Sequence, residues 1–235
     1  MRKGLAAKAI GTAGPALLVL SLADPAFAHD VAHGDRGFIE ATSGVRLAAF
    51  FYLGAKHMVT GYDHLLFLFG VIFYLYQFRQ IALYVTLFAI GHSTTLILGV
   101  LLGTHFSPYL VDAVIGLSVA YKGLENMGAF PVWFGIKPDN RVVVAGFGLV
   151  HGLGLATKLQ DLGLAKDGLL PNLVAFNLGV ETGQLLALTA ILIAMGYWRQ
   201  TASFTRHAFA ANVLLVAIGF VLFGQHLAGY FVEKM

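Results

Sequence analysis

The sequence predicts an all-α membrane protein, a polytopic bundle of six transmembrane helices that follows a cleavable signal peptide. Hydrophobic residues make up 58% of the 235 residues and charged residues only 11%, which is far from the composition of a soluble domain. Six apolar segments each approach the roughly 20 residues that a bilayer-spanning helix needs. Helices are favoured because lipid cannot hydrogen-bond to backbone amides, and the segments lack strand-like alternation.

The first 28 residues have the features of a secretory signal peptide. Arg2 and Lys3 form a basic start, residues 13–22 are an apolar run, and Ala26-Phe-Ala28 resembles a cleavage site with small residues. The alternative is that this segment is retained as a further helix. Cleavage followed by six spans would place both termini on the outer, periplasmic side of a bacterial inner membrane.

An exposed segment at 29–47 would precede the first span. A mature terminus at His29 presents an α-amine and an imidazole that can chelate one ion together, and His33 follows closely. This segment is therefore a candidate for metal capture outside the membrane. A hydrophilic spacer with incidental histidines explains the same residues without any metal.

The transmembrane domain is predicted over 48–235. Its apolar segments lie at 48–78, 81–103, 109–127, 141–160, 172–196 and 208–231. Glycine is frequent in the fourth and fifth segments, where small residues let helix backbones approach closely. The glycines concerned are Gly146, Gly148, Gly152, Gly154, Gly179 and Gly183. Helix packing alone accounts for them.

Ionisable side chains inside these segments are the candidate functional residues, because a charge near the centre of a membrane helix costs about 2.5 to 3.5 kcal/mol on insertion scales. Asn177, Glu181 and Gln184 share one face of the fifth segment, which should face the bundle interior. The two amides, with Ser93, are candidates to support metal-binding imidazoles by hydrogen bonds. The candidate ligands are His57, Asp63, His64, His92, His151 and Glu181.

The spacing of two histidines in the first segment limits how they can act. His57 and His64 lie on the same face of a helix but differ in height by about 10 Å. One ion cannot contact both unless the helix breaks, for which Gly61 is the only obvious place. Otherwise the histidines belong to successive stations, and such a ladder suits an ion path better than one closed site.

Composition excludes several other kinds of chemistry. The chain has no cysteine, so disulfides, thiolate metal sites and cysteine nucleophiles are excluded, and any metal must be held by nitrogen and oxygen. The net charge of +3 is scattered without a basic face, so nucleic acid is not an expected partner. A single buried histidine can simply hydrogen-bond between helices, whereas the whole set favours a metal or proton site.

Four motifs carry a resemblance to a known family. They are His57-x5-Asp63-His64, Gly91-His92-Ser93, Phe147-Gly-Leu-Val-His151-Gly and Phe176-Asn177-Leu-Gly-Val-Glu181-x-Gly-Gln184. With them the chain resembles the HupE/UreJ membrane proteins, which are associated with nickel supply to hydrogenase and urease. The resemblance implies a divalent transition metal, with Ni²⁺ favoured over Cu, Co or Zn, and a hydrogenase- or urease-type metalloenzyme system as a partner.

The first of these motifs matches the His-x5-Asp-His motif of nickel permeases. The chain departs from their second motif, Phe-His-Gly-x-(Ala/Val)-His-Gly-x-Glu. Gly148 stands where the first histidine of that motif would be, and Leu155 lies near the position of its acid. The departure indicates a divergent branch, in which Glu181 is the candidate for a compensating acid.

The leading hypothesis is a secondary permease that admits Ni²⁺ or another divalent ion along an intramembrane path of histidines and carboxylates. One alternative is an intramembrane zinc hydrolase, in which His64, His92 and His151 hold the metal and Asp63 or Glu181 activates water. Another is a metal-binding membrane subunit that delivers ions to a partner enzyme. Stations spread over more than one helical turn favour a path, whereas convergence on one ion favours catalysis.

The remaining polar residues near the span ends have simpler interpretations. Glu125 lies beside Lys122 and is interpreted as half of an interfacial charge pair, or as an exit ligand. His105, His207 and His226 lie near loops or span ends and are predicted to be interfacial.

Overall fold

The computed structural model describes residues 44–161 and 167–235. Within these ranges the secondary structure is helical, without a strand, which confirms the all-α part of the predicted fold class. The helices are α3 (Leu47–Thr60), α4 (Tyr62–Ile72), α5 (Phe78–Leu102), α6 (Pro108–Asn126), α7 (Ala129–Phe134), α8 (Asn140–Asp161), α9 (Leu169–Arg199) and α10 (Ala202–Glu233). The predicted signal peptide, His29 and His33 lie outside the described residues.

Four of the described helices, α5, α8, α9 and α10, are long and apolar enough to cross a membrane. The segment predicted as one span at 48–78 is two helices instead, α3 and α4, and α4 is apolar but shorter than a span. Helix α6 also carries the charged residues Asp112, Lys122 and Glu125. The prediction of apolar membrane helices is therefore supported, while the number of six spans stays a prediction.

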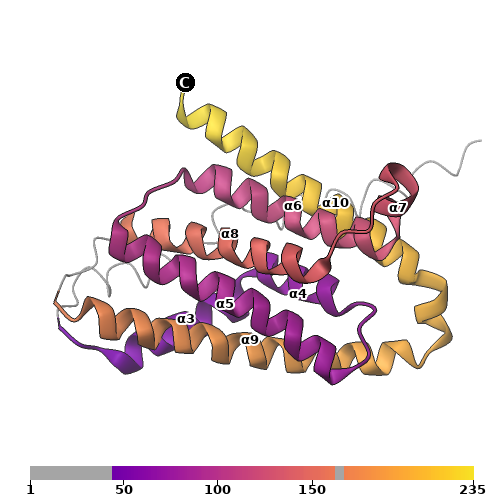
Figure 1. Cartoon of the computed structure of the whole chain (residues 1–235), viewed down its shortest axis with the longest axis horizontal. Helices are drawn as coiled ribbons and strands as arrows, with labels where there is room; N and C mark the ends of the chain where they lie inside the picture. Colours follow the sequence, from indigo (N-terminus) through magenta and orange to yellow (C-terminus); the bar gives the residue numbers. More distant parts are fainter. Residues whose placement is uncertain (1–43, 162–166) are drawn as a thin grey trace, which may run out of the picture.

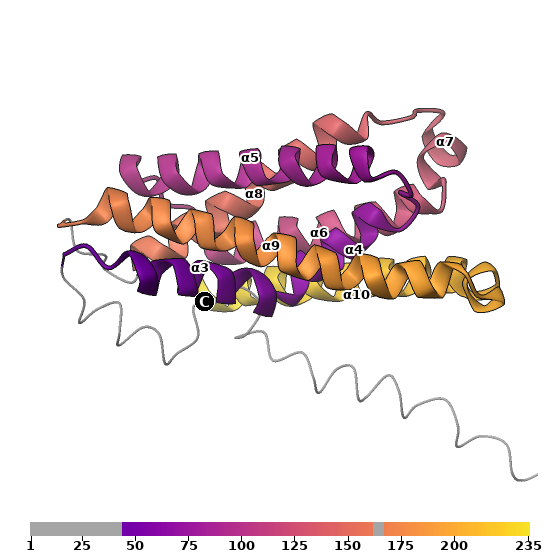
Figure 2. The ribbon, with the colours of Figure 1, turned by 90° about the horizontal axis from the view of Figure 1, so that it is seen from below.

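Three helix pairs make up most of the bundle: α3 with α9, α5 with α8, and α6 with α10. The members of each pair run beside one another (Figure 1), as the view from below also shows (Figure 2). The short α4 contacts α3, α5, α6, α9 and α10. Helix α4 is therefore the element that the three pairs share.

Glycines bring the two helices of each pair into close contact. A Cβ atom added at any of these positions would overlap the backbone of the facing helix. The glycines are Gly54 and Gly179 between α3 and α9, Gly148 and Gly152 between α5 and α8, and Gly116 and Gly219 between α6 and α10. Small residues serve membrane helices in this way because lipid provides no hydrophobic force between them. Gly146, predicted to be part of such a contact, has nothing within 4 Å of an added Cβ atom.

The carboxyl end of α4 is held by an arginine from α9. Arg199 donates hydrogen bonds to the carbonyl oxygens of Ile72 and Phe73, the latter at 2.9 Å. The last carbonyl groups of a helix have no partner within the helix, and a cation there also suits the negative end of the helix dipole. The ring of Phe73 stacks on Phe204 of α10 at 5.6 Å between centroids. These contacts fix the position of α4 between the pairs.

We predict that Gly179→Ala destabilises the protein by about 1 to 3 kcal/mol, as overpacking of a tight contact does, because its methyl group would overlap the Phe51 carbonyl of α3. Gly196→Ala, on the same helix, is the matched control, since an added Cβ atom there has nothing within 4 Å. The control should be neutral or stabilising, because alanine favours helix over glycine by about 1 kcal/mol. Thermal unfolding in detergent measures both, and equal effects would contradict the close contact.

Candidate functional site

Three buried histidine rings lie around a fourth, that of His64, in the interior of the bundle. The ring centroid of His64 lies 4.8 Å from that of His151, 5.3 Å from that of His57 and 5.9 Å from that of His92. The four side chains come from α3, α4, α5 and α8, and each residue is at most 6% exposed. We call His57, His64, His92 and His151 the histidine cluster.

The break between α3 and α4 brings the first two histidines together. Helix α3 ends at Thr60 and α4 begins at Tyr62, with Gly61 in an extended conformation at φ −72° and ψ 95°. In a continuous helix the two side chains would differ in height by about 10 Å, yet the ring centroids are 5.3 Å apart. The break expected at Gly61, if one ion were to contact both histidines, is therefore present, and the alternative of successive stations, which assumed an unbroken helix, does not apply to His57 and His64.

The close contact of α5 and α8 places the other two histidines. Gly152 follows His151 directly, and a Cβ atom on it would overlap the backbone carbonyl of His92. The Thr95 hydroxyl of α5 also donates a hydrogen bond to the Leu149 carbonyl of α8 at 2.7 Å. Because the backbones approach this closely, His92 and His151 both reach His64.

Asp63 orients His64 at the start of α4. One carboxylate oxygen of Asp63 accepts the backbone N–H of His64 at 2.8 Å and lies 3.0 Å from its ring Nδ1. A carboxylate also suits the positive end of the helix dipole, since Asp63 lies in the first turn. A proton on Nδ1 that points at the carboxylate leaves the Nε2 lone pair of His64 as the one that can bind a cation.

Ser118 of α6 orients His151, as Asp63 orients His64. This role of Ser118 was not predicted from the sequence. The Ser118 hydroxyl donates to the Ile115 carbonyl at 2.7 Å, and its oxygen lies 3.2 Å from Nε2 of His151. Because the hydroxyl proton is already used, Nε2 of His151 is the donor in this contact. The Nδ1 lone pair of His151 then becomes the potential ligand. Ser93, the predicted supporting residue, is half-buried on α5.

His92 has the environment expected of a potential ligand. Both of its ring nitrogens are buried and neither makes a hydrogen bond within residues 44–161 and 167–235. Buried polar atoms usually have partners. No three His, Asp or Glu side chains in those same ranges are arranged to hold one ion. Since nitrogen ligands lie about 2.0 to 2.1 Å from an ion such as zinc, the rings must rotate toward one another before they can share a cation.

The predicted polar face of α9 is only partly in the interior. Asn177 and Gln184 are buried, and Gln184 donates to the Val85 carbonyl of α5 at 3.4 Å. Glu181 is half-buried, and no hydrogen bond or ion pair joins it to the histidine cluster in the described part of the chain. Helix α9 approaches the cluster through Phe176, whose ring lies 6.4 Å from that of His57.

A buried carboxylate, that of Asp112, lies outside the histidine cluster, and it was not predicted from the sequence. Asp112 of α6 is 6% exposed and pairs with Lys158 of α8 at 2.9 Å. His226 of α10, predicted to be interfacial, is instead buried and lies 3.9 Å from the same carboxylate oxygen. The prediction for His226 failed because a position near a span end says nothing about which helix covers it. An acid within the apolar run of α6 was the signal that could have pointed to Asp112.

Two of the simpler predictions agree with the structure. His105 and His207 are exposed, and His105 pairs with Asp161 at 2.7 Å. Glu125 forms the expected charge pair with Lys122 at 2.6 Å.

Comparison with protein families identifies the family to which the chain belongs. Residues 33–234 match the family model described as HupE / UreJ protein, and this range includes the histidine cluster. The chain belongs to the HupE/UreJ family. HupE/UreJ proteins are associated in general with nickel and cobalt transport, and membership together with the apolar helices identifies a membrane protein. No curated protein and no solved structure matches this HupE/UreJ chain.

We predict that Gly61→Ala weakens Co²⁺ binding by roughly 10- to 100-fold, the usual effect of losing support for a metal ligand. The added Cβ atom would lie 3.0 Å from Nδ1 of His64 and 3.2 Å from the Asp63 carboxylate, and would disturb their contact. Co²⁺ titration followed by visible absorbance measures the affinity. Gly146→Ala is the control, because its Cβ atom meets nothing within 4 Å. Unchanged binding in Gly61→Ala would show that the contact between Asp63 and His64 does not support the metal site.

Proposed function

We propose that this protein is a secondary permease for a divalent transition metal ion, with Ni²⁺ as the favoured cargo. The observation that carries the proposal is the convergence of four buried imidazoles, from four helices, on one place inside a membrane protein. Imidazole suits nickel, copper and zinc. Ionisable groups in this position commonly mark ion pathways. General association of the HupE/UreJ family with nickel and cobalt transport supports the same cargo.

The compact cluster favours one central station over the ladder that spacing suggested. Many secondary transporters bind their cargo near the middle of the membrane, at a helix that is interrupted there. The interruption at Gly61 is of this kind. In our proposal His57, His64, His92 and His151 bind the ion in turn or together, and Asp63 offsets part of its charge. Glu181, Asn177 and Gln184 line the outer part of the path on α9.

The proposed setting is a bacterial inner membrane, with both termini on the periplasmic side. The segment that contains His29 and His33 would then collect the ion outside, and a gradient or trapping of the ion inside would drive uptake. A hydrogenase- or urease-type system would consume the nickel. These parts of the proposal rest on the resemblance to the family and on the predicted signal peptide.

Uptake into proteoliposomes tests the proposal, with Ni²⁺, Co²⁺, Cu²⁺ and Zn²⁺ compared. We predict that Asp63→Asn and His64→Ala each abolish uptake of the ion that the native protein carries. His105→Ala is the matched control, because that histidine is exposed and pairs with Asp161 away from the cluster. It should leave uptake unchanged.

One outcome would overturn the permease. The native protein would take up none of the ions, while metal copurified with it and was lost from Asp63→Asn and His64→Ala. A metal-binding subunit that delivers ions to a partner enzyme would then be the better description.

The convergence of the rings also favours a second candidate, the intramembrane hydrolase. His64, His92 and His151 come from three helices, and the ring centroids of His92 and His151 lie 5.9 and 4.8 Å from that of His64. Three histidines are the ligand set of some catalytic zinc sites, and these rings would have to rotate toward one another before they could share one ion. Asp63 is engaged with His64, so as placed it orients a ligand rather than activates water. Hydrolysis of a peptide or ester substrate that requires Zn²⁺ and is lost in His92→Ala would establish this candidate.

A further inference from the structure

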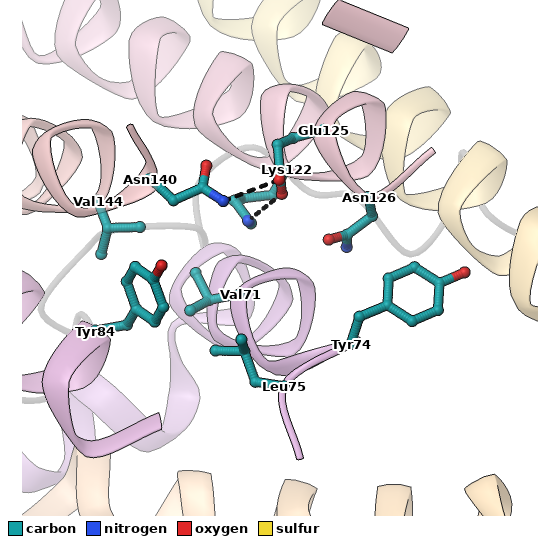
Figure 3. Close-up of a pocket in the computed structure, with 9 residues that line it drawn as sticks. All are labelled: Val71, Tyr74, Leu75, Tyr84, Lys122, Glu125, Asn126, Asn140 and Val144. Atoms are coloured by element: carbon teal, nitrogen blue, oxygen red, sulfur yellow. Dashed lines mark hydrogen bonds and ion pairs between the residues drawn. The ribbon is translucent and has the colours of Figure 1, made fainter. Parts of the chain in front are cut away.

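A cavity of about 150 Å³, lined by both polar and apolar side chains, lies at the end of the bundle where α4 ends and α8 begins. Figure 3 shows its lining, with Lys122 and Glu125 of α6 facing Asn140 of α8, and with Tyr84 of α5 beside them. Val71 of α4 also lines the cavity. The cavity is separate from the histidine cluster, although it is built from the same helices.

Three helices run from the cluster to this cavity. Each places a cavity residue seven or eight positions from a histidine, which corresponds to about 10 to 12 Å along the helix. The pairs are His64 and Val71 on α4, His92 and Tyr84 on α5, and His151 and Val144 on α8. The cavity therefore lies in line with the cluster along the bundle.

A layer of phenylalanine rings separates the two places. Phe67, Phe88 and Phe147 each lie between the histidine and the cavity residue of their own helix. The ring of Phe67 lies 5.3 Å from Phe88 and 5.8 Å from Phe147. Phe88 also faces His151 at 5.1 Å. An apolar constriction of this kind stops ions by excluding water, so passage from the cluster to the cavity requires the rings to move.

The cavity contains oxygen atoms that could bind a metal ion, but the ammonium group of Lys122 already contacts one of them. Lys122 Nζ donates to one oxygen of Glu125 at 2.6 Å, and Asn140 Nδ2 donates to the other at 2.9 Å. Lys122 is only 3% exposed. The Oδ1 atom of Asn140 is buried and makes no hydrogen bond within the two described ranges. Carboxylate and amide oxygens can bind a divalent cation, but here the ammonium group competes with it.

We propose that this cavity is a second, weaker binding site for the transported divalent cation, where Glu125 and Asn140 receive the ion after it passes the phenylalanine layer. The inference rests on the proposed permease. Conduction requires sites that release the ion as well as bind it. A carboxylate that returns to Lys122 once the ion has left meets that requirement. In the proposed orientation this end of α8 faces the cytoplasm, so the cavity is the exit.

Two substitutions test the site from opposite directions. Glu125→Gln removes the charge that receives the ion, so uptake should fall by roughly tenfold or more, while binding of one ion at the histidine cluster stays as in the native protein. Lys122→Gln removes the competing ammonium group, so a second ion per chain should be retained and uptake should slow. Equilibrium dialysis with Ni²⁺ counts the bound ions, and proteoliposomes report uptake.

Asp161→Asn is the matched control, because it removes a carboxylate from the exposed pair with His105 and should change neither readout. Should Glu125→Gln fail to fold, Asn140→Ala removes the amide oxygen from the same cavity and is expected to slow uptake severalfold. Native uptake in Glu125→Gln, with one ion still bound in Lys122→Gln, would overturn the second site and leave the permease standing. Absence of uptake by the native protein would overturn the permease itself.

Discussion

The break between α3 and α4 at Gly61 places the rings of His57 and His64 next to one another in the interior of the bundle, with their centroids 5.3 Å apart. It also creates a new helix amino terminus inside the protein, which Asp63 occupies. That terminus favours a carboxylate, and the carboxylate in turn fixes the orientation of His64. The opposite end of α4 is held by Arg199, so this short helix is fixed at both ends.

The positions of the other two histidines depend on contact between backbones. Helices in lipid associate through close packing, because the surrounding chains are as apolar as the helices themselves. Gly148 and Gly152 let α8 lie directly against α5. This close contact places His92 of α5 and His151 of α8 near His64 of α4. The site is thus assembled mainly by shape. Hydrogen bonds from Asp63 and Ser118 then set the orientation of two of its rings.

Helix α6 connects the cluster to buried charges on both sides. Its central Ser118 meets His151, while Asp112 pairs with Lys158 toward one end and Glu125 pairs with Lys122 toward the other. Buried ion pairs contribute little net stability, and removal of one partner is strongly destabilising because it leaves the other charge uncompensated. Such pairs are therefore expensive features for a membrane protein to keep. Their placement along one line with the cluster is consistent with movement of a cation through the bundle.

Several properties could be derived from the sequence alone. Composition and periodicity predicted the helical membrane protein, the absence of cysteine limited any metal to nitrogen and oxygen ligands, and intramembrane position singled out His57, His64, His92 and His151. The helical fold and the apolar helices were confirmed because hydropathy and helical period are local properties of the chain. The same local argument named Gly61 as the one place where a break would bring His57 and His64 together.

Only the tertiary structure decided that the break is made, that four rings meet, and that Glu181 remains apart from them. It also revealed Ser118, Asp112 and the burial of His226. These features depend on which helices lie against one another. That depends in turn on contacts between residues far apart in the chain, such as Gly152 with the carbonyl of His92. A helical pattern shows which residues share a face, but it contains no distance from that face to another helix.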